Sequence, residues 1–293
     1  MLASAQRRYI CAGVADNVRA DGRGRLDYRY VEVYTSVLPQ CNGSARVKLA
    51  AGSATDVVCA IKLEVGTPSA DRPDEGRVSV MVECSPSVQA QRRARHGNAA
   101  PEALNDTLTE AVDRAVNCPG ALDLSQLCIV KGKFCWVAHV DVMVLDGSGG
   151  NLGDTCCLAA HAALSCTAVP RTEPVSIEGG ARAGEEEFDV DPDVGAARLL
   201  DATGLPICIT AWEVDGRFIV DATLEEEMCG SASLTVAADR ARHICGVCKG
   251  GKGTLGPDES RAVVQSVPEI AAVLFERLDE VLREANRTAT TNG

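Results

Sequence analysis

Residues 42–49 read Asn-Gly-Ser-Ala-Arg-Val-Lys-Leu, and this stretch sets the pattern that decides the fold class. From residue 45 to residue 49, apolar and polar side chains alternate, as they do in a strand with one face on a core. The alternation recurs before and after this stretch. We therefore predict four strands in the first third of the chain, at residues 30–38, 45–49, 57–65 and 77–84.

Helical spacing first appears at residues 101–116, where four apolar side chains fall on one face: Leu104, Leu108, Ala111 and Val112. The segment before it, residues 86–101, is polar, basic and without a period, so we predict a loop there. The first half then continues with two predicted strands and an alanine-rich helix, at residues 127–130, 134–145 and 154–168.

The second half follows residues 178–195, whose Gly, Glu and Asp are typical of a linker. Asp215-Gly216 separates two apolar runs and predicts a tight hairpin. A long apolar stripe predicts a final helix over 257–284, kinked or broken at Pro268 because proline removes a backbone donor. The strands of this half are predicted at residues 206–214, 217–222, 231–238 and 243–249.

Both halves place antiparallel strands before a helix. This order predicts an α+β chain with two similar lobes of antiparallel or mixed sheet packed by helices. We assign residues 1–190 to the first lobe, with its core at about 28–170, and residues 191–293 to the second lobe with the C-terminal helix.

The composition is that of an ordinary globular protein: 46% of the 293 residues are hydrophobic and 24% are charged. The net charge of −12 does not favour a protein that binds nucleic acid unaided, so such contacts should be local or shared with a more basic partner. No apolar run is long enough to span a bilayer, and residues 1–10 lack the apolar segment of a secretory signal. We expect an intracellular protein without membrane contact.

Fourteen cysteines in such a protein should be reduced thiols. Most lie in apolar stretches and resemble small core side chains: Cys59, Cys128, Cys135, Cys156, Cys157, Cys166 and Cys208. Cys245 and Cys248 have the spacing of a metal-binding pair, but no second close pair could complete four ligands. We therefore expect no metal site and no cofactor, and the role of this pair stays open.

Six short motifs, in this order, resemble the RNase PH superfamily. They are Arg-Ala-Asp-Gly-Arg at 19–23, the stretch at 42–49, Pro-Asp-Glu-Gly at 73–76, Cys-Trp-Val-Ala-His-Val-Asp-Val at 135–142, Gly-Gly-Asn-Leu at 149–152 and Val-Asp-Ala-Thr-Leu-Glu-Glu-Glu at 220–227. The resemblance covers about residues 19–285. Within the superfamily, the chain looks like the exosome ring subunits of eukaryotes that are related to the non-catalytic archaeal subunit.

The resemblance implies an RNase PH-type fold in a six-membered ring around a channel for single-stranded RNA. The expected partners are related ring subunits and RNA-binding cap subunits. The expected role is 3′-to-5′ RNA processing and degradation, including rRNA maturation and mRNA turnover, in the nucleus, nucleolus and cytoplasm. Active members of the superfamily are phosphorolytic: phosphate attacks the terminal phosphodiester and releases a nucleoside diphosphate.

The resemblance also implies that the catalytic residues are lost here. Active relatives carry a Thr-Arg or Ser-Arg pair at the mouth of a helix, where this chain has Asn151-Leu152. They also carry aspartates about ten and twelve residues after the aspartate that matches Asp221, where this chain has Ser231 and Ser233. We therefore expect a protein without enzymatic activity, and an active phosphorolytic 3′-exoribonuclease is the alternative.

Three other patterns could suggest chemistry, and each has a simpler interpretation. The acidic run 225–227 could be a residual metal site, but a solvated acidic turn is favoured. Residues 246–252 match the start of a phosphate-binding loop, but Gly253 stands where a hydroxyl is required. No nucleophile-elbow pattern supports a hydrolase triad drawn from Ser148, Ser165, His161 and Asp154.

RNA contact is predicted at four arginines. Residues 91–96 read Gln-Arg-Arg-Ala-Arg-His and form a basic cluster in an acidic chain, so Arg92, Arg93 and Arg95 could be a solvated loop or an RNA contact. Counted back from Ala-Leu-Asp-Leu at 121–124, the resemblance places Arg114 on an RNA-facing arginine of the archaeal relative. The alternative for Arg114 is a surface ion pair with Asp113.

Overall fold

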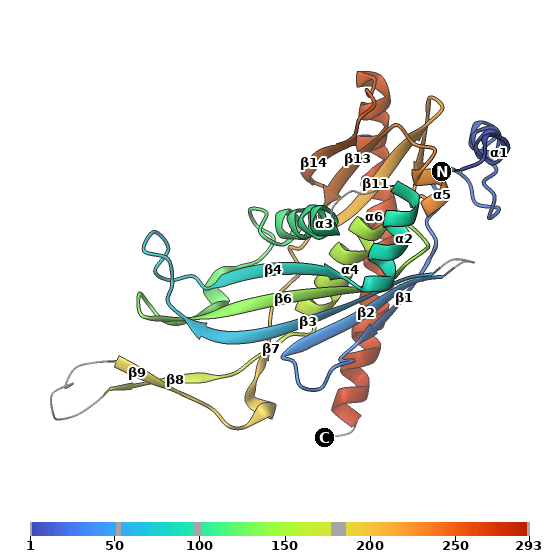
Figure 1. Ribbon diagram of the computed structural model, residues 1–293. Helices are drawn as coiled ribbons and strands as arrows, with labels where there is room; N and C mark the ends of the chain where they lie inside the picture. Colours follow the sequence, from blue (N-terminus) through green and yellow to red (C-terminus); the bar gives the residue numbers. More distant parts are fainter. Residues whose placement is uncertain (1, 51–53, 97–100, 177–185, 292–293) are drawn as a thin grey trace.

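The computed structural model describes residues 2–50, 54–96, 101–176 and 186–291, and its main elements are two sheets around a central helix (Figure 1). The first sheet has the strand order β1-β2-β3-β6-β4, and the short β5 pairs with β6. All its pairs are antiparallel except β4–β6, which is parallel. Its strands are β1 (Tyr30–Thr35), β2 (Gly43–Ala50), β3 (Thr55–Gly66), β4 (Arg77–Cys84), β5 (Cys128–Val130) and β6 (Phe134–Gly147).

A single row of paired residues crosses the whole first sheet and is buried throughout. Val33 pairs with Val47, and Val47 with Val57. Val57 then pairs with Val144, and Val144 with Cys84. All five residues are at most 7% exposed. The alternation in residues 42–49 thus correctly predicted a strand and the face that it buries.

The second sheet is antiparallel, with the strand order β12-β11-β13-β14. Asp215 and Gly216 join two of its strands and have φ values of 50° and 74°. Positive φ at both positions is what a two-residue type I′ hairpin turn requires, so the predicted hairpin is confirmed. The strands are β11 (Ile207–Val214), β12 (Arg217–Val220), β13 (Ala232–Ala238) and β14 (Ile244–Gly251).

Helix α4 (Leu152–Ser165) lies between the two sheets (Figure 1). Twelve of its fourteen residues are buried. Its four fully buried alanines allow β2 and β3 to approach from one side and β11 from the other: Ala159, Ala160, Ala162 and Ala163. Because one apolar cluster includes residues from both sheets and from α4, the two lobes share a core.

Two further helices cover this core. Helix α3 (Pro101–Val116) packs on α4 and β4, and its bounds are those predicted. Helix α6 (Pro257–Thr291) packs on β11, β13 and β1. Pro268 was predicted to kink or break this helix; the break is wrong, because α6 continues past it, and the kink stays a prediction. The buried Val267 and Ala271 anchor the helix to the core on both sides of the proline.

Residues 86–96 form a helix, α2 (Pro86–His96), so the predicted loop is wrong there. The start of α2 follows the ordinary rules. The Ser85 hydroxyl accepts a hydrogen bond from the backbone N–H of Val88. Pro86 occupies the first helical position, where the backbone nitrogen has no partner within the helix, so a proline loses no hydrogen bond there. Val88 is 1% exposed and is the only buried apolar side chain on that turn. One apolar residue cannot produce the repeating pattern by which a helix is recognised in a sequence.

The predicted linker is also partly structured. Its described end contains β9 (Glu186–Val190), which pairs with β8 (Thr172–Ser176), while residues 177–185 lie outside the described ranges. Phe188 packs on Phe134 with ring centroids 5.2 Å apart, and this contact ties the hairpin to the first sheet. The remaining short elements are β7 (Ala168–Val169), β10 (Arg198–Leu199), α5 (Leu224–Glu227) and the 3-10 turns Leu124–Leu127 and Val194–Ala196.

An N-terminal helix, α1 (Ser4–Ala15), was not predicted from the sequence. It buries only Ile10 and Val14, which pack against Val214 and Ile219 of the second sheet. Two buried positions on a polar helix give no periodic signal. Of the helices in the described part of the chain, none combines the length and apolar character needed to cross a membrane.

Candidate functional site

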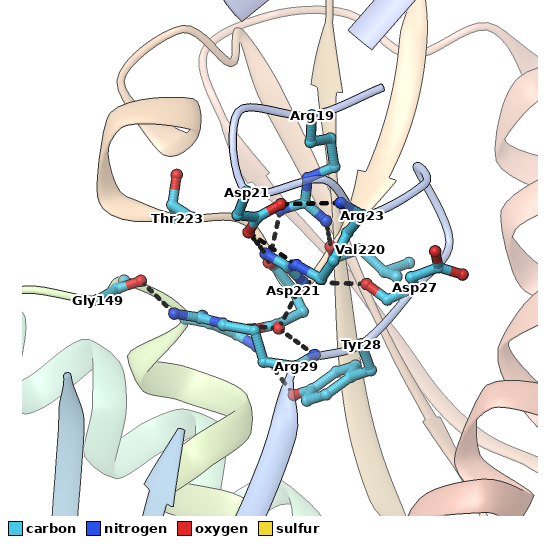
Figure 2. Close-up of polar contacts among 12 residues, drawn as sticks. Arg19, Asp21, Arg23, Asp27, Tyr28, Arg29, Gly149, Val220, Asp221 and Thr223 are labelled. Atoms are coloured by element: carbon cyan, nitrogen blue, oxygen red, sulfur yellow. Dashed lines mark hydrogen bonds and ion pairs between the residues drawn. The ribbon is translucent and has the colours of Figure 1, made fainter. Parts of the chain in front are cut away.

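The residues that match the family's catalytic region meet where the two lobes join. The turn before α4, the segment 19–29 and the turn between β12 and α5 come together there (Figure 2). Gly150 has a φ of 76°, and a Cβ on it would lie 2.5 Å from the backbone nitrogen of Leu224. Only glycine allows the turn before α4 to lie this close to α5.

Asp221 is the centre of this region and is fully buried. Its carboxylate accepts hydrogen bonds from the Arg29 guanidinium at 2.6 and 2.8 Å and from the Arg29 backbone nitrogen at 2.8 Å. Arg23 and the Asn151 side chain each donate another at 2.8 Å. Five N–H donors, four of them from Arg23 and Arg29, therefore saturate both oxygens. Figure 2 shows the two arginines around Asp221. A carboxylate with these partners has no open position for a cation.

Arg19 forms a second buried pair beside the first. Its guanidinium donates to the two carboxylate oxygens of Glu226 at 2.8 and 2.5 Å, and to the backbone carbonyls of Val220 and Asp221. Glu226 is only 4% exposed and also closes a capping box with Thr223 at the start of α5. The solvated-turn interpretation of residues 225–227 is therefore wrong for Glu226, although Glu225 is exposed.

Glu227 contacts the N-terminal end of α4. Its Oε1 accepts a hydrogen bond of 2.6 Å from the backbone nitrogen of Asn151, the residue before the helix. A helix N-terminus attracts anions because its first N–H groups have no partner within the helix. At this helix the negative charge comes from the chain itself.

Asn151 and Leu152 both point into the protein. The Asn151 amide donates to Asp221 and to the Tyr28 hydroxyl, at 2.8 and 2.9 Å. Leu152 is 2% exposed and belongs to the shared core. Neither side chain presents a donor to solvent at the place where active relatives would bind phosphate.

Ser231 and Ser233 lie outside the cluster around Asp221. Ser231 is exposed, and both its hydroxyl and its backbone nitrogen donate to Glu213. Ser233 is buried and its hydroxyl faces Gly250, where a Cβ would lie 2.5 Å from it. Both serines therefore contact residues of the second sheet, Glu213 and Gly250, and neither is bonded to Asp221.

The sequence did not reveal that Asp154 belongs to a buried series of hydrogen-bonded side chains. Its carboxylate accepts the backbone N–H of Thr210 at 2.8 Å and lies 2.6 Å from the Thr210 hydroxyl, which in turn contacts the Thr235 hydroxyl at 2.8 Å. Burial raises the pKa of Asp154 to about 7, and the charge of Asp221 adds to the increase. The Tyr28 hydroxyl lies 3.4 Å from the same carboxylate.

The structure does not gather the tempting hydrolase residues. His161 packs edge-on against Phe275, and neither of its ring nitrogens makes a full hydrogen bond. Ser165 donates to the backbone carbonyl of His161, an ordinary bond within the helix. Ser148 donates to the backbone of Ala54.

The glycine-rich run is a strand rather than a phosphate-binding loop. Residues 246–251 lie in β14, and the next helix starts only at Pro257. No cluster of three or more His, Cys, Asp or Glu side chains suited to a metal ion occurs among the described residues.

Arg114 is exposed on α3, where its guanidinium pairs with Glu110 one turn earlier and donates to the Cys248 sulfur at 3.2 Å. A surface ion pair therefore forms, but with Glu110, because Asp113 accepts from Asn117 instead. The other arginines of the predicted RNA contact are Arg92, Arg93 and Arg95. They lie on the last turns of α2, and their side chains fall outside the described residues.

Comparison with known proteins identifies the class of protein that this fold and site define. Residues 27–170 match the first domain of the 3′ exoribonuclease family, and residues 204–264 match its second domain. The chain therefore belongs to the RNase PH family of 3′ exoribonucleases, and the predicted two-lobed α+β fold of RNase PH type is confirmed.

Particular members are similar along almost the whole chain. The exosome complex component Rrp42 of Methanocella arvoryzae is 34% identical over 96% of this chain and 98% of its own length. A putative exosome complex exonuclease RRP42 of Dictyostelium discoideum is 28% identical over 94% of this chain and 96% of its own length. A chain of the Archaeoglobus fulgidus exosome with RNA bound to the active site superimposes with a TM-score of 0.77 at 30% identity, covering 93% and 97%.

Proposed function

We propose that this chain is a non-catalytic, RNA-guiding subunit of a six-membered exosome ring of the eukaryotic type. Similarity over nearly its full length to archaeal and Dictyostelium exosome proteins supports a place in such an assembly. Similarity to a chain of an exosome with bound RNA supports single-stranded RNA as the ligand of the ring. The net charge of −12 supports an RNA contact that is shared with more basic subunits.

One observation carries the non-catalytic part of the proposal. The N-terminus of α4 meets the Glu227 carboxylate, while the neighbouring Leu152 is buried in the core. Phosphorolysis brings an inorganic phosphate and an RNA phosphodiester together, so its site must supply positive charge. Here Arg29, which donates to the Gly149 carbonyl of the turn, and Arg23 are both already paired with Asp221.

In this role the subunit contacts related RNase PH-like ring subunits and RNA-binding cap subunits. The ring acts in 3′-to-5′ RNA processing and degradation, including rRNA maturation and mRNA turnover. The ring carries out this processing and degradation in the nucleus, the nucleolus and the cytoplasm. The native mass of the complex purified with this chain tests the partnership, because a heteromeric ring of six related subunits has a defined mass.

The activity test uses the purified chain with 5′-labelled single-stranded RNA, inorganic phosphate and magnesium. The proposal expects neither shortening of the RNA nor nucleoside diphosphates above a mock preparation made without the chain. The alternative is an active phosphorolytic 3′-exoribonuclease, which the name of the Dictyostelium relative favours. Phosphate-dependent release of nucleoside diphosphates that scales with the amount of chain establishes that alternative.

A further inference from the structure

Strand β14 forms one edge of the second sheet and is uncovered on both of its faces. Among the described strands it pairs with β13 alone. Seven of its eight residues are exposed and the other, Gly250, is half-buried. In the neighbouring β13, five of the seven residues are buried. The core of the second sheet therefore ends at β13, and β14 extends beyond it.

Two other edge strands are protected by contacts within the chain, and β14 is not. On β4, two backbone N–H groups donate to side chains of α3, at 3.0 and 3.2 Å. On β12, the backbone N–H of Val220 donates to the Arg25 carbonyl at 2.9 Å. Within the described residues, no hydrogen bond from another element reaches the backbone of β14 beyond its pairing with β13. Its outward N–H and C=O groups are therefore open to pairing with another strand.

The sequence of β14 does little to prevent such pairing. Natural edge strands are blunted by prolines, bulges or charges. Residues 244–251 contain no proline and one charge, and the pairing with β13 is regular from Gly246 to Gly251, after an irregularity at the start of the strand. Ile244 and Val247 are 37% and 53% exposed. These apolar side chains stay in water unless a partner covers the strand.

The charge around β14 indicates an acidic partner. Residues 244–257 contain two exposed lysines, Lys249 and Lys252, and no acidic residue, whereas the whole chain has a net charge of −12. A polypeptide strand fits this edge better than RNA does. The outward carbonyl groups of a strand edge repel phosphates, and β14 carries no aromatic side chain on which a base could stack.

We propose that β14 is a docking strand, and that an extended acidic segment of a neighbouring ring subunit pairs with its free edge. This inference rests on the proposed ring. The added strand continues the second sheet across the boundary between the subunits and covers Ile244 and Val247. Backbone hydrogen bonds supply the affinity of such strand addition. Lys249 and Lys252 favour a partner segment with acidic side chains.

The test compares the isolated chain with the complex purified through it, whose native mass shows whether a heteromeric ring has formed. Cys245 and Cys248 are exposed on β14, so their alkylation reports the accessibility of the strand. In the ring, N-ethylmaleimide should modify both thiols about tenfold more slowly, and the amide hydrogens of residues 244–251 should exchange more slowly by a similar factor.

Each other outcome counts against the docking strand. A ring in which these rates equal those of the isolated chain overturns it and leaves the ring itself intact. If no ring forms, the proposed function and the docking strand both fail. Protection that appears only when single-stranded RNA is added assigns the edge to RNA. Protection within a homodimer of the isolated chain assigns it to a second copy.

A charge reversal tests the chemistry of the partner. Lys249→Glu combined with Lys252→Glu should reduce the incorporation of the chain into the ring several-fold at low salt. The matched control is Lys131→Glu combined with Lys133→Glu, because these two lysines are also exposed and close together in the sequence. Equal incorporation of the two double variants overturns the acidic partner.

Two proline variants test the backbone pairing. Consecutive N–H groups of a strand point to opposite edges, so one of Val247→Pro and Cys248→Pro removes an outward N–H, and the other removes a bond to β13. The variant that keeps the wild-type melting temperature in isolation should fail to enter the ring, and its normal incorporation overturns the proposal. Where both variants unfold, the amide exchange of the wild-type chain decides the question.

Discussion

The Glu227 carboxylate accepts a 2.6 Å hydrogen bond from the backbone nitrogen of Asn151, at the N-terminal end of the central helix α4. The two residues are 76 positions apart in the sequence. The contact joins the start of α4 in the shared core to the end of α5 in the second lobe. It also places a negative charge of the chain where an active relative would hold phosphate.

Removing this carboxylate should therefore expose an anion site. We expect Glu227→Ala to lower the free energy of unfolding by about 1–2 kcal/mol, as the loss of a helix cap does. Phosphate should then raise the melting temperature of the variant more than that of the wild type, measured against chloride at equal ionic strength. The exposed Glu225→Ala is the control. Equal responses to phosphate in wild type and Glu227→Ala would contradict this account of the closed site.

Asp221 should be among the most sensitive positions for stability. Asp221→Asn leaves the buried Arg29 without its counter-charge and removes one of the two carboxylates that pair with Arg23. Breaking a buried pair typically costs about 3–5 kcal/mol. Asparagine tolerates the left-handed φ of 47° at this position, so the backbone adds little to the effect. Urea unfolding measures the loss.

The control for Asp221→Asn is an exposed pair in the first sheet. Glu64→Gln disrupts a salt bridge with Lys62 in which both side chains are more than half exposed. Such pairs are worth less than about 1 kcal/mol. If the two variants lose similar stability, the cluster around Asp221 does not hold the lobes together.

Asp154 should make stability depend on pH in the direction opposite to that of an ordinary salt-bridged aspartate. Its folded-state pKa of about 7 lies above the usual value of 3.8, so the folded protein holds a proton that the unfolded chain has released. Stability is greatest below about pH 4 for this group alone, and it falls as the pH rises towards 7.

Asp154→Asn removes that titration and can keep the bonds to Thr210 with its amide. The free energy of unfolding of the variant relative to wild type should therefore rise between pH 5 and pH 8, by on the order of a few kcal/mol. Urea unfolding at several pH values measures the difference. A difference that stays constant with pH would show that Asp154 titrates normally.

How far the sequence predicts the structure depends on whether the signal is local. The strands of the first sheet could be predicted because Val31, Val33 and their counterparts repeat every second residue along the chain. Helix α2 was missed because its stability depends on Ser85, Pro86 and one buried valine, and such a short signal resembles a polar loop. The break expected at Pro268 failed because tertiary packing outweighs one missing backbone bond.

The site was less predictable than the fold, because its contacts cross the chain. Motif matching indicated that Asn151 and Leu152 differ from active relatives, but it could not show that Glu227 caps the same helix. Three successive glutamates look alike in sequence. In the structure, one is exposed, one pairs with Arg19 over 207 positions, and one binds the start of α4. Only the capping-box spacing of Thr223 and Glu226 offered a local signal.

The last prediction concerns RNA. If Arg114 guides RNA in the assembled ring, Arg114→Glu should weaken the binding of single-stranded RNA without dissociating the ring. The effect should shrink as salt increases, because a phosphate contact is screened and the release of its counterions is less favourable at high salt. Fluorescence anisotropy with a labelled RNA measures the affinity, and native mass measures the assembly.

Arg72→Glu provides the matched control for that experiment. Arg72 is exposed and pairs with an acidic residue of its own segment, Glu75, as Arg114 pairs with Glu110, so both variants change the net charge equally. A general charge effect would weaken RNA binding in both variants. A specific contact would weaken it only in Arg114→Glu, because the phosphate must lie within reach of that side chain. Unchanged affinity of the Arg114→Glu ring at low salt would leave Arg114 with only its surface contacts to Glu110 and Cys248.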